Sequence, residues 1–293
     1  MILKAFVFAL ASCAGFAVIA APTAASESQV YTPYGLRPAA NVRLVPDGAS
    51  VHHVGNDVHI LDAKGTTIDK ITPTGNLTKA TRTSAAGALQ TGWIAYAYWM
   101  NSVNSPINYF DTTWVVPPAP QRTTDGQLLF LFNSIETSTG DSILQPVLQW
   151  GVSAAGGGPY WSIATWFGIG GHFLHSNLVT VKPGQVLQGI ISLTGIGNVG
   201  YNYICYFNGL GYRMSVTGSK QLMWATETFE VYNIQSKSDF PLGSTMFSNI
   251  HLRTIAGYPS VFWWTDSSTQ DDVEALVSRQ GSNGGAIQIV YQY

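Results

Sequence analysis

Hydrophobic and polar residues alternate along residues 224–232, and this run carries two glutamates. Side chains on a β-strand point to opposite faces in turn, so Glu227 shares a face with Phe229, while Glu230 shares the other face with Tyr232. The two carboxyl groups therefore point apart. Because burying a carboxylate is unfavourable, the pattern indicates a functional role for at least one of them, with a partner from elsewhere in the chain.

The same strand-like signal recurs from Gly92 to the C-terminus, where β-favouring runs are separated by Gly and Pro turns. The predicted strands cover residues 92–100, 109–116, 127–133, 143–150, 161–167, 178–181, 186–194, 201–207, 213–216, 222–234, 246–252, 261–265 and 286–292. One helix is predicted, over residues 269–280. Many short antiparallel strands joined by such turns are typical of two packed sheets, so we predict an all-β sandwich.

The chain begins with the pattern of a secretory signal peptide. In residues 1–20, Lys4 is followed by an apolar run and by small residues before a cleavage point near Ala20. We therefore predict a secreted, extracellular protein. Of the two cysteines, Cys13 lies in this leader, which leaves Cys205 alone and excludes an intrachain disulfide. We interpret Cys205 as a small core residue, because no basic neighbour lowers its pKa.

Residues 21–90 differ in composition from the rest and hold one predicted hairpin, formed by residues 57–62 and 67–71. A single hairpin is too small to be a stable domain. We therefore interpret this segment as a propeptide or an accessory layer, and residues 91–293 as the sandwich domain. A sequon at Asn76 predicts glycosylation of a surface loop.

Charge excludes several classes of partner. The chain has 14 Lys and Arg against 16 Asp and Glu, and removing the leader with its Lys4 leaves 13 against 16. No basic stripe is present to neutralise phosphates, so we expect no nucleic-acid partner.

No apolar run beyond the leader is long enough for a membrane-spanning helix. His172 and His175 lack a carboxylate or thiol at ligand spacing, so we expect no metal and no cofactor. We also expect a monomer.

Two amides stand in a strand that is otherwise apolar. Gln145 and Gln149 share a face with Ile143 and Val147. Buried amides must form hydrogen bonds, so the two could simply bridge neighbouring strands. Alternatively, one of these amides is directed at the carbonyl group of a substrate.

These residues resemble the glutamic peptidases, the eqolisin family of fungal acid proteases. The matching segments follow the order of the family pattern and comprise residues 110–117, 131–136, 142–150, 160–167 and 225–231. The resemblance implies a concanavalin A-like, lectin-type sandwich of two antiparallel sheets. It also implies that Gln145 and Glu227 are the catalytic pair, on adjacent strands of one concave sheet. The chain departs from the pattern in lacking the family's disulfide cysteines and in having Thr165 where the family has an acid.

The resemblance further implies a groove for a peptide. Its predicted lining consists of Phe132, Glu136, Trp150, Trp161 and Trp166, with Phe132 standing where the family usually has tryptophan. For the three tryptophans, a place in the sandwich core remains the alternative.

The function implied is a secreted acid endopeptidase that acts on polypeptides. Glu227 would be the general base with a raised pKa, and Gln145 would position the attacking water and donate to the oxyanion. This chemistry requires both side chains on one face, within about 8 Å of each other.

Three other functions stay open at this point. A lectin-like module would bind glycans on the same concave sheet through aromatic rings, without catalysis. A structural or inhibitory protein with a degenerate site is the second. A glycosidase would need Glu136 or Asp141 to face Glu227.

The N-terminal segment suggests a form of regulation. If it is an inhibitory propeptide, its basic residues would pair with acids near the cleft at neutral pH. It would then be released below about pH 4, as carboxylates become protonated.

Overall fold

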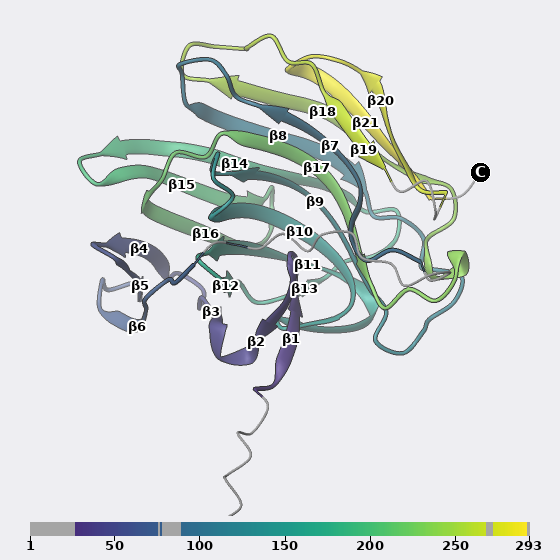
Figure 1. The fold of residues 1–293 in the computed structure, drawn as a ribbon, viewed down its shortest axis with the longest axis horizontal. Helices are drawn as coiled ribbons and strands as arrows, with labels where there is room; N and C mark the ends of the chain where they lie inside the picture. Colours follow the sequence, from purple (N-terminus) through teal and green to yellow (C-terminus); the bar gives the residue numbers. More distant parts are fainter. Residues whose placement is uncertain (1–26, 76, 78–88, 268–271, 292–293) are drawn as a thin grey trace, which may run out of the picture.

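The computed structural model describes residues 27–75, 77, 89–267 and 272–291. It is an all-β sandwich of two large, mainly antiparallel sheets (Figure 1), as the sequence predicts. Among the described residues, the only helical elements are two short 3-10 turns, Ala39–Asn41 and Lys237–Asp239. No helix in these ranges is both long and apolar enough to span a membrane.

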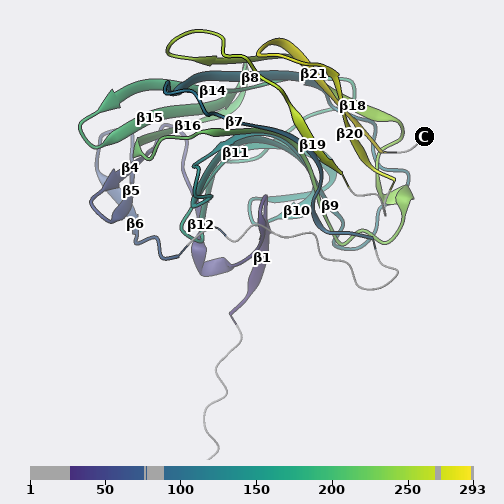
Figure 2. The same ribbon diagram turned by 45° about the horizontal axis from the view of Figure 1, so that its top comes forward.

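We call the nine-stranded sheet the inner sheet. Its strand order is β19-β7-β17-β9-β10-β11-β12-β3, and β13 pairs separately with β11. Its strands are β3 (Val42–Leu44), β7 (Gly92–Met100), β9 (Leu128–Glu136), β10 (Ser142–Ser153), β11 (Gly156–Ile169), β12 (His172–His175), β13 (Val179–Thr180), β17 (Trp224–Tyr232) and β19 (Trp264–Ser267). Figure 2 shows this sheet curved into an arch, with β1 beneath it.

The ten-stranded outer sheet covers the convex side of that arch. Its order is β20-β21-β18-β8-β14-β15-β16-β4-β5-β6. Its strands are β4 (Ser50–Val54), β5 (Asp57–Leu61), β6 (Thr67–Ile71), β8 (Ile107–Val115), β14 (Val186–Gly197), β15 (Gly200–Phe207), β16 (Leu210–Ser219), β18 (Ser244–Thr254), β20 (Glu274–Arg279) and β21 (Asn283–Val290). A two-stranded hairpin, β1 (Gln29–Thr32) and β2 (Gly35–Pro38), makes up the third sheet.

Strand alternation divides the hydrophobic side chains into two clusters. The larger one lies between the sheets and includes Leu144 of β10, Phe229 of β17 and Trp114 of β8. The smaller one lies on the concave face of the inner sheet and includes Val147, Phe132 and Trp166, together with Tyr34 from the hairpin. The centre of the inner sheet is therefore buried on both faces, because the N-terminal segment covers it on the side that the outer sheet leaves open.

The N-terminal segment extends both large sheets. Strand β3 pairs in parallel with β12 of the inner sheet, and β4 pairs in parallel with β16 of the outer sheet. The predicted hairpin is confirmed as β5 and β6, which pair antiparallel. The short strands β1 to β4 were not predicted, because their residues lack a sustained apolar alternation.

The predicted helix over residues 269–280 is wrong where the structure describes it. Residues 268–271 lie outside the described part of the chain, and Glu274–Arg279 is strand β20, which pairs with β21. Its ladder to β21 satisfies the backbone and outweighs the local helix preference of Glu, Ala and Leu. Cys205 is fully buried in β15, as expected for a small core residue, and burial raises its pKa.

Candidate active site under the N-terminal hairpin

Gln145 and Glu227 do not share a surface. Gln145 points to the concave side of the inner sheet, where its Nε2 donates to the carbonyl oxygen of Pro33 at 3.2 Å. Glu227 points between the sheets, where it accepts a hydrogen bond from the hydroxyl of Thr112 on β8. The expectation that the two face one concave surface on adjacent strands is therefore wrong. Strand β9 lies between β10 and β17, so the two residues are not on adjacent strands. Because side chains alternate along each strand, Gln145 and Glu227 point to opposite faces of the sheet.

The Glu227 environment is that of a structural carboxyl group. The side chain is fully buried, and desolvation raises its pKa well above the usual value, more strongly than its bond to Thr112 lowers it. The negative charge of Asp111 adds to the rise. Glu227 is thus held protonated between the two sheets, out of reach of any ligand on the concave face.

Glu230 is the buried carboxyl group of β17 that faces the concave side. The hydroxyl of Tyr232 donates to it, and the Trp93 indole and the Arg37 guanidinium also favour its charged form. Desolvation is the dominant effect and raises the pKa of Glu230 to about 8. The sequence placed Glu230 and Tyr232 on one face correctly but assigned them no role.

The tip of the β1–β2 hairpin occupies this face. The N–H of Tyr34 donates to the carbonyl of Thr32 at 2.8 Å, and the Thr32 hydroxyl donates to the carbonyl of Gly35 at 2.9 Å. The carbonyl of Pro33 receives the Gln145 amide, while the N–H of Tyr34 faces Glu230 and lowers its pKa. The peptide bond between Pro33 and Tyr34 therefore lies between the amide of Gln145 and the carboxyl group of Glu230.

The Tyr34 side chain fills an aromatic pocket beside that peptide bond. Its ring meets Trp93 edge-on at 5.7 Å and lies 6.1 Å from Phe173, measured between ring centroids. Its hydroxyl donates to Oε2 of Glu136 at 3.0 Å, and the side chain is fully buried. Burial, followed by the charge of Glu136, raises the Tyr34 pKa. The phenol is thus a pure donor to this carboxyl group.

Arg37 is a basic residue of the N-terminal segment whose charge acts on Glu230. Its guanidinium lies over the Phe173 ring at 5.3 Å and lowers the pKa of Glu230 through its charge. Among the described residues of this segment, Arg37 is an instance of the pairing of basic residues with acids in the cleft that the sequence suggested.

The predicted groove residues divide between the two faces. Phe132, Glu136 and Trp166 lie on the concave side with Gln145. Trp150 and Trp161 lie between the sheets, where their rings form an edge-to-face pair at 5.5 Å. The expectation that these two tryptophans line the groove is wrong, because at their positions on β10 and β11 the side chains point into the core between the two sheets.

The two glutamines of β10 have different roles. Gln149 bridges the β10–β11 turn: its Nε2 donates to the carbonyls of Gly151 and Gly156 at 3.1 and 2.9 Å, and its Oε1 accepts from Ser153. Gln145 makes only the bond to Pro33, and its buried Oε1 has no hydrogen-bond partner among the described residues. A Pro146 without an N–H also interrupts the β9–β10 ladder at this point. Of the two glutamines, therefore, only Gln145 has hydrogen-bonding capacity available for a ligand.

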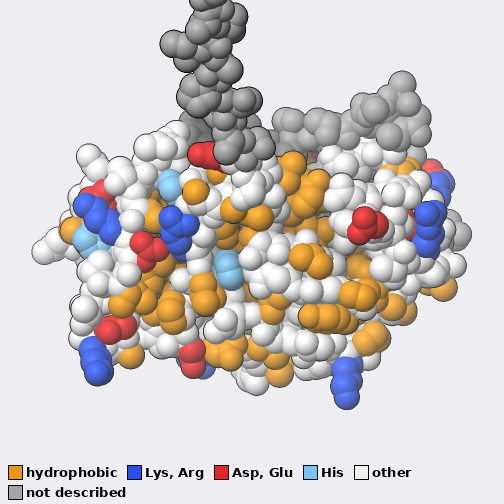
Figure 3. All heavy atoms as spheres, turned by 90° about the horizontal axis from the view of Figure 1, so that it is seen from below, with side chains coloured by type: hydrophobic (Ala, Val, Ile, Leu, Met, Phe, Trp, Pro, Cys, Tyr) orange, Lys and Arg blue, Asp and Glu red, His pale blue; other side chains and the backbone are white. Residues whose placement is uncertain are grey.

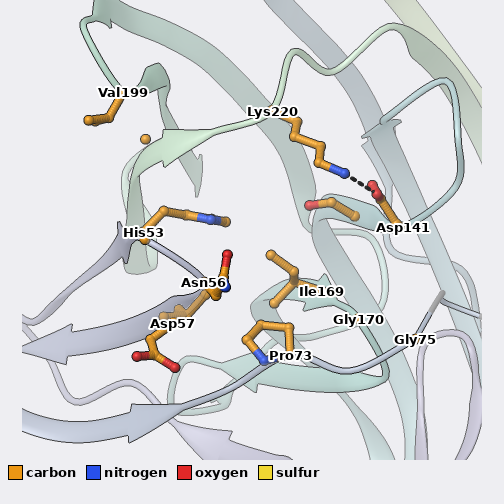
Figure 4. Close-up of a pocket in the computed structure, with 14 residues that line it drawn as sticks. His53, Asn56, Asp57, Pro73, Gly75, Asp141, Ile169, Gly170, Val199 and Lys220 are labelled. Atoms are coloured by element: carbon orange, nitrogen blue, oxygen red, sulfur yellow. Dashed lines mark hydrogen bonds and ion pairs between the residues drawn. The ribbon is translucent and has the colours of Figure 1, made fainter.

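A cavity of about 500 Å³ lies where the N-terminal segment meets the sandwich (Figure 4). It is bounded by His53 and Asp57 on one side and by Asp141 and Lys220 on the other, with Lys220 paired to Asp141 at 2.5 Å. Burial, with the charges of His52 and Lys220, lowers the pKa of His53 to about 4. The described lining of this cavity does not include Gln145 or Glu230.

Two further features of the sequence are the histidine pair and the sequon. Within the described ranges, no group of three or more His, Cys, Asp or Glu side chains comes together as a metal ion requires. His172 and His175 belong to β12, and His175 bonds the carbonyl of Ser176. The sequon residue Asn76 lies outside the described residues.

Comparison with known proteins reveals a distant structural likeness. No protein-family model matches the sequence, and no curated protein matches it. Among solved structures, the chain is similar to SCP-B, a member of the eqolisin family of peptidases, in a complex with the tripeptide Ala-Ile-His. The TM-score is 0.44 and the identity 14%, over 69% of this chain and 100% of that one. A likeness of this size assigns neither activity nor residues.

Proposed function

We propose that this protein is a peptide hydrolase whose catalytic groups are Gln145 and Glu230 on the concave face of the inner sheet. One observation carries the proposal: the chain's own Pro33–Tyr34 peptide bond lies with its carbonyl oxygen on the Gln145 amide and its N–H toward Glu230. These are the contacts that a hydrolase needs with a peptide bond that it cleaves. Glu230 thus takes the role that the sequence resemblance gave to Glu227.

The chemistry follows from the two side chains. With a substrate in place of the hairpin, the Glu230 carboxylate removes a proton from water, and the water oxygen attacks the carbonyl carbon. The charge that develops on the carbonyl oxygen is stabilised by the N–H of Gln145. Glu230 then returns the proton to the nitrogen as the C–N bond breaks, which yields a carboxylic acid and an amine.

Access of water sets the working pH. While the hairpin covers it, Glu230 is largely protonated below about pH 8 and cannot act as a base. Desolvation is the main cause of that shift. Displacing the hairpin relieves it and returns the pKa toward the usual 4.5, so the base is available in mildly acidic solution. We propose an acid-active endopeptidase, secreted by virtue of the leader in residues 1–20.

A glycan-binding module is the second candidate, because aromatic rings continue along the concave face beyond the hairpin. The rings of Tyr98 and Trp224 lie 5.9 Å apart, and Trp264 stands opposite Tyr98 on the edge strand with 59% of its surface exposed. Figure 3 views the molecule from the hairpin side, where hydrophobic side chains gather over much of the face. Such rings stack on sugars as well as on peptide side chains.

Hydrolysis of an unfolded protein substrate between pH 3 and 7, with pepstatin present, tests the proposal. The full chain with Tyr34→Gly is the starting enzyme, because glycine empties the pocket and accepts the Tyr34 backbone angle φ of 145°. We expect cleavage, and loss of at least about a hundredfold in kcat when Glu230→Gln is added. Glu227→Gln is the matched control and should retain activity.

Two outcomes would reject this assignment. If Glu227→Gln abolished cleavage while Glu230→Gln did not, the catalytic glutamate would be the one between the sheets. If the folded Tyr34→Gly chain cleaved nothing at any pH and instead bound oligosaccharides on a glycan array, the concave face would be a lectin site.

A further inference from the structure

The pocket that holds Tyr34 has a polar end and aromatic walls. Trp93 and Phe173 contact the ring, and the carboxyl group of Glu136 receives the hydroxyl at 3.0 Å. All four side chains are buried, with at most 5% of their surfaces exposed. The pocket opens beside the nitrogen of the peptide bond that lies on Gln145 and Glu230, so it receives the side chain that follows that bond.

We infer that this pocket is a specificity site, and that the enzyme selects polypeptides with a tyrosine immediately after the cleaved bond. The inference rests on the proposed function, since it assigns the Pro33–Tyr34 bond to the position of the bond that is cut. Glu136 is then a specificity-determining residue. It contacts the substrate hydroxyl and has no part in moving the proton.

The preference for tyrosine over phenylalanine follows from burial. A phenylalanine would fill the aromatic walls equally well but would bring no O–H to the Glu136 carboxyl group, which is itself fully buried. Sites built to bond a substrate hydroxyl discriminate strongly against the analogue that lacks it. We expect roughly a 10- to 100-fold preference for tyrosine over phenylalanine.

The hairpin occupies this site without being a good substrate, because its tip is closed. The N–H of Tyr34 is bonded back to the carbonyl of Thr32, and the strands on either side pair from Gln29 with Pro38 to Thr32 with Gly35. The Tyr34 backbone also has a φ of 145°, which a bulky residue rarely adopts. An extended substrate has neither the turn nor this constraint, so the hairpin tip acts as a built-in competitor for the tyrosine pocket.

The first experiment measures binding alone, using the full chain with Tyr34→Gly. The probes are p-cresol, which reproduces the tyrosine side chain, and toluene, which lacks the hydroxyl. By titration calorimetry, p-cresol should bind at least about tenfold more tightly than toluene. Adding Glu136→Met should remove that difference, and Glu136→Gln, which keeps an acceptor oxygen, should restore part of it. Equal binding of the two probes in a folded Tyr34→Gly chain would overturn the inference.

The second experiment measures cleavage of two peptides that differ only in Pro-Tyr-Gly or Pro-Phe-Gly at the centre. In Tyr34→Gly, kcat/KM should favour the tyrosine peptide by the same 10- to 100-fold, and Glu136→Met should bring the ratio close to one. Cleavage of both at equal rates would refute the specificity and leave the hydrolase. Retained discrimination between p-cresol and toluene, with no cleavage of either peptide, would instead refute the hydrolase.

Discussion

At the scale of single residues, the two glutamates of β17 lie only three positions apart on one strand but have different surroundings. Glu227 lies between the sheets beside Thr112, and Glu230 lies on the concave face beside Tyr232. Both have raised pKa values because both are buried. Only Glu230 faces the Pro33–Tyr34 peptide bond of the hairpin. Burial alone therefore does not distinguish the two glutamates.

The raised pKa of Glu227 predicts a dependence of stability on pH. Above the ordinary value of 4.5 the unfolded chain releases this proton while the folded chain keeps it, so the free energy of unfolding falls as pH rises from about 4.5. Glu227→Gln, which cannot ionise, should flatten that fall in urea titrations at pH 4, 6 and 8. An unchanged slope in the variant would show that Glu227 is not held protonated.

Gln145 and Gln149 provide a matched pair for a second prediction. Gln145→Ala should lower kcat about a hundredfold or more in the Tyr34→Gly background and should lower stability less than Gln149→Ala, because Gln145 makes one hydrogen bond where Gln149 makes three. Gln149→Ala should do the reverse: activity persists, but stability drops by about 1–3 kcal/mol, because the carbonyls of Gly151 and Gly156 lose their donor. Equal losses of activity in both would contradict a catalytic role for Gln145.

At the scale of elements, strand β4, which pairs with β16 of the outer sheet, carries a histidine whose pKa is lowered by its surroundings. His53 packs edge-on against Phe167 at 6.0 Å and shares its cavity with Lys220, Asp57 and Asp141. Its pKa of about 4 means that the docked strand excludes a proton that free histidine binds below pH 6.5. The positive charge of Lys220 helps to keep His53 unprotonated, and the nearby Asp57 and Asp141 do not reverse the lowering of its pKa.

The sign of that shift predicts loosening in acid. Between about pH 6.5 and 4 only the undocked segment binds the proton, so the docking of β4 weakens as pH falls. Amide protection of β4, corrected for intrinsic exchange rates, should therefore decrease from pH 7 to pH 4 in the wild type. His53→Phe keeps the ring contact and cannot be protonated, so its protection should decrease less than that of the wild type, with His52 as the remaining histidine of β4. The same decrease in both proteins would assign the effect to other groups.

At the scale of the whole molecule, the described part of the N-terminal segment contacts the sandwich at several places, which include the hairpin tip under the arch, β3 beside β12, and β4 beside β16. A protease site introduced between Gly75 and Leu89 should therefore give two fragments that co-elute in size-exclusion chromatography at pH 7.5. Mixing the fragments at pH 4 should lower the fraction that co-elutes. Complete separation at pH 7.5 would show that these contacts do not hold the segment without the covalent link.

The amino-acid sequence by itself determined the fold class and most strands, because alternation and turn residues act over short distances. It also determined which side chains share a face within one strand, such as Glu230 with Tyr232, and it singled out Gln145. Its error over β20 arose where a distant strand, β21, supplies the backbone pairing.

Only the tertiary structure decided which faces meet. The face of β10 that carries Gln145 and the face of β17 that carries Glu230 come together through the order and curvature of the inner sheet, which no local pattern encodes. The role of Tyr34 likewise depends on contacts over more than 100 residues of sequence, from a short hairpin to the end of β9. Periodicity fixes each strand's two faces, but the packing of the whole chain decides which one becomes the site.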